Sequence, residues 1–121
     1  MLPVLRQSPA DTTPILDSEN AAQFLSTYLK DMTTEERKSP LVSPAYNDMK
    51  GMPPALFLLG TEDALVEDTL LMHFKWVRAG NQGIVKFIPS ACHGFMTFDG
   101  SKVEATREGW KAMVQFLQER I

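Results

Sequence analysis

An aspartate and a histidine each follow a short apolar segment in the second half of the chain. Asp63 stands within Gly60–Leu65, and His93 stands within Pro89–Phe95. An aspartate that accepts a hydrogen bond from one ring nitrogen of a histidine fixes the tautomer of the ring and stabilises the imidazolium formed during turnover. The histidine can then take a proton from a serine hydroxyl and later return it to a leaving group. Together the two residues indicate acid–base chemistry.

Taken singly, each of these residue types also has a structural interpretation. An aspartate after a strand often caps the next helix, and Glu62, Asp63 or Asp68 could each do so. A histidine in a loop is often a solvated or hydrogen-bonding residue. His73 falls in the middle of a predicted helix, where we expect it to pack or to face solvent. The position of Asp63 and His93 after consecutive strands is what favours the acid–base interpretation.

Composition limits other kinds of site. With two histidines and one cysteine, and no close ligand spacing, we expect no metal and no cofactor. Cys92 precedes His93 directly, and adjacent loop residues diverge, so a Cys–His nucleophilic pair is not expected. The net charge is −3 and the basic residues are scattered, which argues against nucleic acid as a partner.

The chain also lacks the sequence signals of membrane proteins and of secretion. No apolar run approaches the roughly 20 residues of a membrane span. Met1–Leu5 is too short for the apolar part of a signal peptide, and Pro3 and Arg6 interrupt the stretch. The single cysteine rules out an internal disulfide and fits a reducing compartment. We therefore expect a cytoplasmic protein without a membrane span.

The second half of the chain has the pattern of alternating strands and helices. The apolar run Ala55–Gly60 predicts a strand buried on both faces, and residues 84–88 predict a second strand. Helices are predicted at about 66–78, ending at Ala79–Gly80, and at about 103–119. This order predicts an α/β fold with parallel strands and flanking helices. Neighbouring strands lie ~5 Å apart, so the Asp63 carboxylate can reach the His93 ring.

The first half is less regular. Met1–Leu5 is either the tail of a buried strand or an ordinary N-terminal edge strand that tolerates Pro3. Residues 6–54 are predicted to hold a helix at about 18–30, capped at Asp17–Ser18, then a short helix or turn at Thr33–Glu36 and a proline-rich connector. We therefore divide a single domain, residues 1–121, into a strand (1–5), a helix with connector (6–54) and a βαβα unit (55–121).

Several motifs resemble a known family. They are Ser-Pro-x-x-Ser-Pro at 39–44, Gly-x-x-Asp-x-Leu at 60–65, Ala79–Gly80 and His93–Gly94–Phe95. Nearly the whole chain resembles the C-terminal part of the hormone-sensitive-lipase-like α/β hydrolases, esterases and lipases that act on short to medium acyl esters. The resemblance implies the C-terminal part of an α/β-hydrolase fold, with Asp63 as the triad acid and His93 as the triad base. It also implies that Phe24 or Tyr28 faces the acyl group from the region of the substrate cap.

The chain departs from that family in one respect. The nucleophile of these enzymes lies in a Gly-x-Ser-x-Gly turn and the oxyanion hole in a His-Gly-Gly loop, and neither motif occurs here. Ser90 is near His93 in sequence but lacks the strand-to-helix setting of a nucleophile. The other serines lie in caps, connectors or loops: Ser8, Ser18, Ser26, Ser39, Ser43 and Ser101.

Two functions follow from this departure. The first is a serine-type carboxylic ester hydrolase to which this chain contributes the triad Asp63 and His93. We expect the isolated chain to be inactive, and a small carboxylic ester to be its substrate only when an N-terminal part completes the site. The alternative is a non-catalytic half-domain that binds a second copy or another chain through an open sheet edge, such as that of residues 1–5.

Overall fold

The structure of the protein is a computed structural model that describes residues 15–120. Its elements follow the predicted order: α1 (Ser18–Tyr28), α2 (Thr34–Arg37), the 3-10 turn η1 (Pro44–Tyr46), β1 (Ala55–Gly60), α3 (Val66–Arg78), β2 (Gly83–Ile88), the 3-10 turn η2 (Phe95–Thr97) and α4 (Glu104–Gln118). The helix expected to reach residue 30 ends at Tyr28. The strand expected at residues 1–5 lies outside the described residues.

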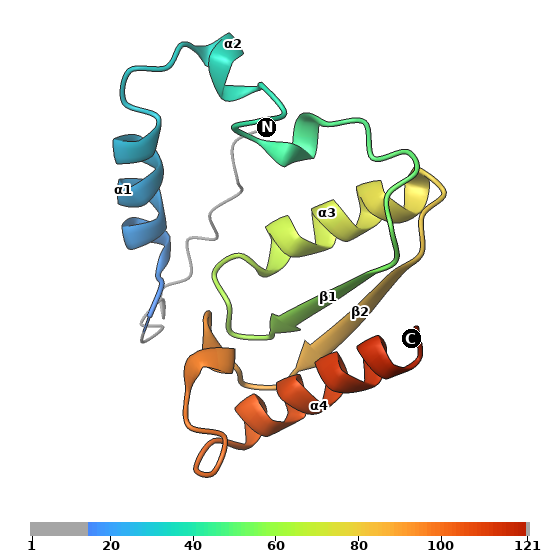
Figure 1. Cartoon of the computed structure of the whole chain (residues 1–121). Helices are drawn as coiled ribbons and strands as arrows, with labels where there is room; N and C mark the ends of the chain where they lie inside the picture. Colours follow the sequence, from blue (N-terminus) through green and yellow to red (C-terminus); the bar gives the residue numbers. More distant parts are fainter. Residues whose placement is uncertain (1–14, 121) are drawn as a thin grey trace.

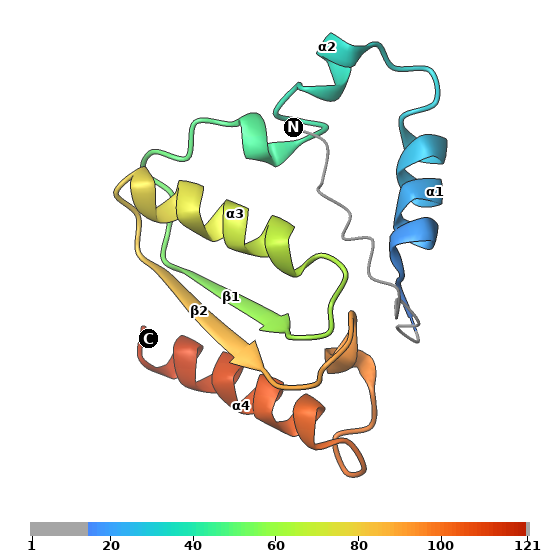
Figure 2. The same cartoon turned by 180° about the vertical axis from the view of Figure 1, so that it is seen from behind.

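The two strands form a parallel sheet with a helix on each face. Ala55 pairs with Gly83 at one end of the ladder and Gly60 pairs with Ile88 at the other. Helix α3 lies on one face of this sheet and α4 lies on the opposite face (Figures 1 and 2). The predicted α/β class with parallel strands and flanking helices is confirmed. Because both strands run in the same direction, the loops that leave Gly60 and Ile88 begin at the same edge.

Alternate side chains of β1 pack on opposite faces, as the pleat of a strand requires. Phe57 meets the rings of His73 and Trp76 on α3 edge-on, with centroids 5.3 and 5.8 Å apart. Leu58 packs against the buried cluster of Ile88, Ala91 and Phe95 on the face of α4.

Burial of β1 is lower than the sequence predicted. Leu59 is buried, but Ala55–Leu58 are only half-buried, so the expectation of a strand buried on both faces is wrong for most of its length. The physical reason is the small number of strands. Within residues 15–120 the sheet has two strands, so the second edge of β1 has no partner strand there.

Side chains of α3 and of the turn after it hold the proline-rich connector in place. The Lys75 ammonium donates a hydrogen bond to the carbonyl of Ala45. Asn81 accepts from the backbone N–H of Met52 at 3.0 Å and donates to the carbonyl of Met49. These bonds satisfy polar groups of a segment that forms no ladder, and they lead the chain into the start of β1.

Helix α1 is stabilised mostly by local groups. Asp17 caps its start by accepting from the backbone N–H of Asn20 at 2.7 Å. The Arg37 guanidinium donates to the carbonyls of Leu29 and Met32 just beyond its end, at 3.0 and 3.1 Å. In both views α1 lies to one side of the βαβα unit and packs on neither face of the sheet (Figures 1 and 2). None of the helices within residues 15–120 is long and apolar enough to cross a membrane.

Candidate functional site

The loop after β1 holds the Asp63 carboxylate in a defined orientation. The backbone N–H of Asp63 donates to the carbonyl of Gly60, and the Asp63 Oδ1 atom accepts from the backbone N–H of Leu65 at 2.8 Å. Leu65 is the N-cap of α3, which has no side-chain cap. Asp63 therefore does not cap α3 in the usual way, and its side chain is 14% exposed. The carboxylate is free to bind a second donor.

The loop after β2 makes two changes of backbone direction around His93. Ser90 has a φ of 57°, and Gly94 has a φ of 69°. A left-handed conformation costs an L side chain ~1 kcal/mol and costs glycine almost nothing, so the glycine after His93 suits its position. Ala91 and Phe95 on either side of His93 are buried, with 2% and 5% exposure. The loop is thus anchored at both ends while the histidine between them stays partly accessible.

The two loops bring Asp63 and His93 into contact. The Nδ1 atom of His93 lies 3.1 Å from Oδ1 and 3.0 Å from Oδ2 of Asp63. Because a carboxylate only accepts, this contact requires the proton on Nδ1, which leaves the lone pair of Nε2 available. The His93 side chain is 39% exposed, so an approaching group can reach the ring. Such an arrangement can accept a proton at Nε2 while Asp63 stabilises the resulting charge.

Helix α4 anchors the loop that carries His93 through two side-chain hydrogen bonds. The buried Thr106 hydroxyl donates to the carbonyl of Phe95 at 2.6 Å, and the Trp110 indole N–H donates to the carbonyl of Met96 at 3.3 Å. Gly109 lies between them on the same helix face, and a Cβ placed there would be 2.2 Å from the Met96 sulfur. Residues 106, 109 and 110 therefore form one contact face for η2.

Other residues considered from the sequence take different positions. The His73 Nε2 atom lies 3.2 Å from the carbonyl of Gly83, so this histidine serves packing, as predicted. Phe24 and Tyr28 are 71% and 63% exposed. Cys92 is a free, half-buried cysteine. Among residues 15–120 no group of three or more potential metal ligands of the His, Cys, Asp and Glu types occurs.

Two neighbours of the pair were not expected from the sequence. A Cβ placed on Gly94 would lie 3.7 Å from Cδ1 of Ile15, so an apolar side chain from before α1 lies beside the histidine loop. The Thr61 hydroxyl accepts from the backbone N–H of Ser90 at 2.8 Å and joins the two loops. Neither contact could be predicted from a local pattern in the sequence, because each joins residues of distant segments whose separation in space depends on strand register.

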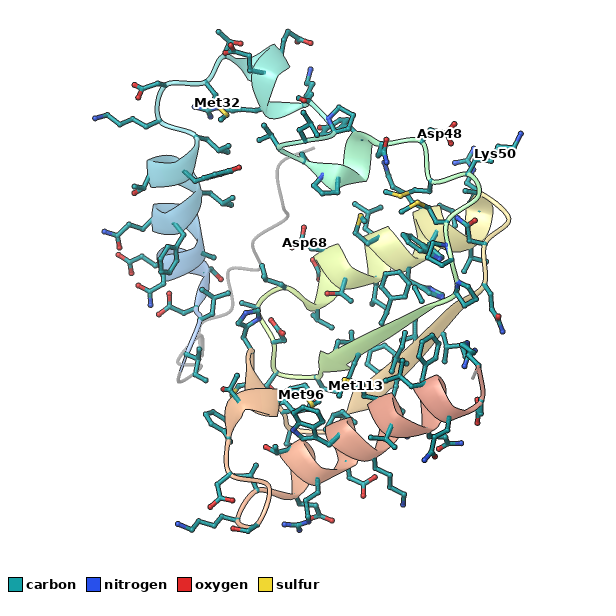
Figure 3. All side chains as sticks on the ribbon, viewed as in Figure 1. Met32, Asp48, Lys50, Asp68, Met96 and Met113 are labelled. Atoms are coloured by element: carbon teal, nitrogen blue, oxygen red, sulfur yellow. The ribbon has the colours of Figure 1, made fainter. Side chains whose placement is uncertain are left out.

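Asp68, in the first turn of α3, has an unusual environment. Burial raises the pKa of this carboxyl, and the negative charge of Glu67 raises it further, while its own backbone N–H lowers it. Its Oδ2 atom is buried and has no hydrogen-bond partner within the described part of the chain. Figure 3 marks Asp68 at the start of α3. Burial is the largest of these causes.

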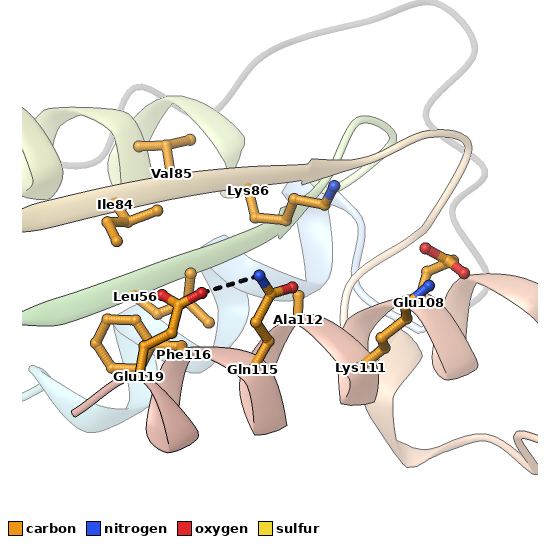
Figure 4. A pocket seen from close by; sticks show the side chains of 10 residues that line it. All are labelled: Leu56, Ile84, Val85, Lys86, Glu108, Lys111, Ala112, Gln115, Phe116 and Glu119. Atoms are coloured by element: carbon orange, nitrogen blue, oxygen red, sulfur yellow. Dashed lines mark hydrogen bonds between the residues drawn. The ribbon is translucent and has the colours of Figure 1, made fainter. Parts of the chain in front are cut away.

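An open groove lies away from the Asp63–His93 pair. It has a volume of about 320 Å³ and runs between the strands and α4. Its floor is apolar, with Leu56, Ile84 and Phe116, and charged side chains such as Lys86 and Glu119 surround it (Figure 4). Neither Asp63 nor His93 lines this groove. The pair therefore lies at the carboxyl edge of the sheet, outside the groove.

Comparisons with known proteins agree on the fold. The profile of a protein family described as the alpha/beta hydrolase fold matches residues 3–97. Among solved structures, a hormone-sensitive lipase from a metagenome library superposes with a TM-score of 0.78 and 27% identity over 88% of this chain and 35% of that one. The thermophilic and thermostable carboxylesterase EstE1, cloned from a metagenomic library, gives a TM-score of 0.72 and 32% identity over 83% of this chain and 33% of that one.

These matches also define how much of the fold the chain contains. A third solved structure, the hormone-sensitive lipase homologue EstE7 from a metagenome library, has a TM-score of 0.76 and 27% identity over 86% of this chain and 34% of that one. The chain spans about a third of the length of the solved structures it matches. The comparison with curated proteins found no match.

Proposed function

The chain belongs to the alpha/beta hydrolase fold family, and from this premise we propose that it supplies the acid and the base of a serine-type carboxylic ester hydrolase. The observation that carries the proposal is the contact of 3.0 Å between Nδ1 of His93 and the Asp63 carboxylate, made by the loops at the carboxyl ends of both strands. Binding and catalytic groups of open α/β sheets lie at that edge. The similarity to a hormone-sensitive lipase and to a carboxylesterase favours carboxylic esters as the substrates.

In the proposed reaction each residue has one role. The Nε2 atom of His93 takes the proton of a serine hydroxyl as the serine oxygen attacks the ester carbonyl carbon. His93 then gives that proton to the departing alcohol, and a water molecule repeats the two steps to release the acid. Asp63 keeps the proton on Nδ1 throughout and stabilises the imidazolium. No metal or other cofactor enters these steps.

The serine and the oxyanion-hole donors of this reaction are proposed to come from outside the 121 residues. The sequence has no Gly-x-Ser-x-Gly turn. Of the serines in the described residues, Ser90 has its N–H bound to Thr61 and a left-handed backbone at the end of a strand, with no helix directly after it. Without oxyanion donors, each worth ~3–4 kcal/mol in the transition state, the isolated chain is expected to be inactive.

Hydrolysis of p-nitrophenyl butyrate tests this proposal. The protein alone should react at the buffer rate, whereas a fusion with about the N-terminal two thirds of EstE1 placed before residues 1–121 should be active. In that fusion, Asp63→Asn should lower kcat on the order of 10⁴-fold, and His93→Ala at least as much. His73→Gln changes the other histidine, which packs against Phe57, and should leave the rate within a few-fold. A fusion whose activity survives His93→Ala would contradict the proposal.

A second candidate function, assembly with another chain, is favoured by exposed apolar faces. On α3, Leu70, Phe74 and Val77 are 36%, 58% and 46% exposed at the spacing of one helix face. Helix α4 exposes a similar row of apolar side chains: Trp110, Val114 and Leu117. The edge of β1 that has no partner strand within residues 15–120, like each of these faces, is suited to a second copy or a larger partner.

Light scattering with size-exclusion chromatography tests this second candidate. The protein should elute as a dimer or larger assembly at high concentration, and Phe74→Glu should shift it toward the monomer. Lys50→Glu, which changes charge at an exposed position of the connector, is the matched control and should leave the elution unchanged. A clean monomer of the unmodified protein at high concentration would exclude self-assembly.

A further inference from the structure

The loop after β1, which carries Asp63, and the loop after β2, which carries His93, are joined by more than the Asp63–His93 contact. The backbone N–H of Thr61 donates to the carbonyl of Ile88 at 3.1 Å, and that of Glu62 donates to the carbonyl of Ala91 at 3.0 Å. Between them the Thr61 hydroxyl accepts from the backbone N–H of Ser90 at 2.8 Å. The three bonds lie between the carboxyl end of the sheet and the contact of Asp63 with His93.

Only one of these three bonds uses a side chain. The other two join backbone groups, so any residue at those positions can make them. The Ser90–Thr61 bond needs a hydroxyl or another acceptor at position 61, and it falls at the one non-glycine residue of positive φ within residues 15–120. Since that conformation is unfavourable for serine, an acceptor for its N–H is needed to hold it.

We propose that Thr61 is a positioning residue for His93. By holding Ser90 in the left-handed conformation, its hydroxyl fixes the path of the loop that places Nδ1 of His93 on the Asp63 carboxylate. The inference rests on the proposed function, because it assigns to Thr61 the task of keeping the catalytic tautomer. Thr61 is exposed and contributes little to the core, so its hydroxyl can be removed without a cavity.

The ring tautomer of His93 measures this role directly. Long-range ¹H–¹⁵N correlation spectra of the intact protein, at a pH where the ring is neutral, report the ratio of the Nδ1–H form to the Nε2–H form. Asp63 should make the Nδ1–H form predominant, and Asp63→Asn should abolish that preference. His73 provides an internal reference, since its contact with the carbonyl of Gly83 requires the Nε2–H form.

Two variants of Thr61 separate the hydroxyl from the rest of the side chain. Thr61→Val keeps the shape and removes the acceptor, and it should lower the Nδ1–H to Nε2–H ratio of His93 about 5-fold, as expected for one lost hydrogen bond. Thr61→Ser keeps the hydroxyl and should stay within about 2-fold of the unmodified protein. The His73 signals should be the same in all variants.

Three outcomes would overturn the inference: an unchanged ratio in Thr61→Val, an equal change in Thr61→Ser, or a parallel change at His73. The measurement needs no serine nucleophile and no substrate. If the esterase fusion is inactive while the ratio responds to Thr61→Val, the proposed function fails and the positioning contact stands. If the fusion is active and the ratio does not respond, only the role of Thr61 fails.

Discussion

Residues 17–38 and residues 55–120 are stabilised by different kinds of interaction. In the first region the defining bonds are local, such as Asp17 to Asn20 and the reciprocal pair of Thr33 and Glu36 at the start of α2. In the second region the bonds join distant segments. The Thr106 hydroxyl binds a carbonyl 11 positions away, and the Asp63–His93 contact spans 30 positions.

The difference shows which interactions can build a site. A local cap makes one helix begin or end, but it does not set the distance between groups on different elements. Strand pairing does, because the register from Ala55↔Gly83 to Gly60↔Ile88 fixes where both loops start. We therefore expect changes in the first region to affect helix content alone, and changes in the second to move the Asp63–His93 pair as well. Both tryptophans, Trp76 and Trp110, lie in the second region, so their fluorescence reports on it.

The largest effect is expected for Gly60→Ala. A Cβ at this position would lie 2.0 Å from the carbonyl oxygen of Ala91, a backbone atom of the loop that carries His93, so the backbone would have to shift. The loss should be about 3 kcal/mol in urea unfolding followed by tryptophan fluorescence. Gly51→Ala is the control in the connector, where φ is 74° and nothing lies within 4 Å. Gly51→Ala should lower the stability by only ~1 kcal/mol. If the two variants lose the same stability, the close contact between Gly60 and the Ala91 carbonyl is not important for the fold.

The next largest effect is expected for Thr106→Val. The change leaves the Phe95 carbonyl without its donor in a buried site, at a cost of about 2 kcal/mol. Thr106→Ser keeps the hydroxyl and should lose ~1 kcal/mol for the missing methyl group. Urea unfolding measures both, and the His93 ring resonances should shift in Thr106→Val alone. If the serine variant is the less stable one, the hydrogen bond does not hold the loop.

Asp17→Ala should have a smaller and purely local effect. It removes the acceptor for the Asn20 N–H at the start of α1, at a cost of ~1 kcal/mol to that helix. Helix content measured by far-ultraviolet circular dichroism should fall, while the tryptophan unfolding curve and the His93 resonances stay unchanged. Asp17→Asn retains a good cap and should resemble the unmodified protein. A shift of the His93 resonances in Asp17→Ala would show that the two regions are coupled.

The smallest effect is expected for Asp68→Asn, and it depends on pH. Because the pKa of Asp68 is raised in the folded state, its ionisation destabilises the fold as pH rises through that pKa. The variant should be more stable at pH 7 by less than ~1 kcal/mol, since the carboxyl is partly solvated. The gain should vanish below the ordinary aspartate value of 3.8. Thermal unfolding at several pH values measures this gain.

Asp99→Asn is the control with the opposite sign. Hydrogen bonds from Ser101 lower the pKa of Asp99, so its ionised form stabilises the fold above the ordinary pKa, and this stability is lost as pH falls through the lowered value. Asp99→Asn should therefore reduce stability at neutral pH. If both variants are more stable than the unmodified protein at pH 7, the gain in Asp68→Asn does not come from the raised pKa of Asp68.

The βαβα unit could be predicted closely from the sequence, because its elements have strong patterns. The run Ala55–Gly60 and the periodic segment before Gly80 place β1 and α3 where the structure has them. The burial of these elements could not be predicted as well. Apolar spacing identifies the face of α3 that contains Phe74, but that face is exposed here, since spacing does not tell whether another element covers it.

The order of strands and helices could be predicted from the sequence, together with the residue types that follow each strand. It singled out Asp63 and His93, because loops after parallel strands share one edge of a sheet. The three-dimensional structure was needed to show that the contact is made at Nδ1, that Thr61 joins the loops at Ser90, and that Ile15 lies beside Gly94. These are distances between segments far apart along the chain. They depend on strand register and on close packing, which no local pattern of residues contains.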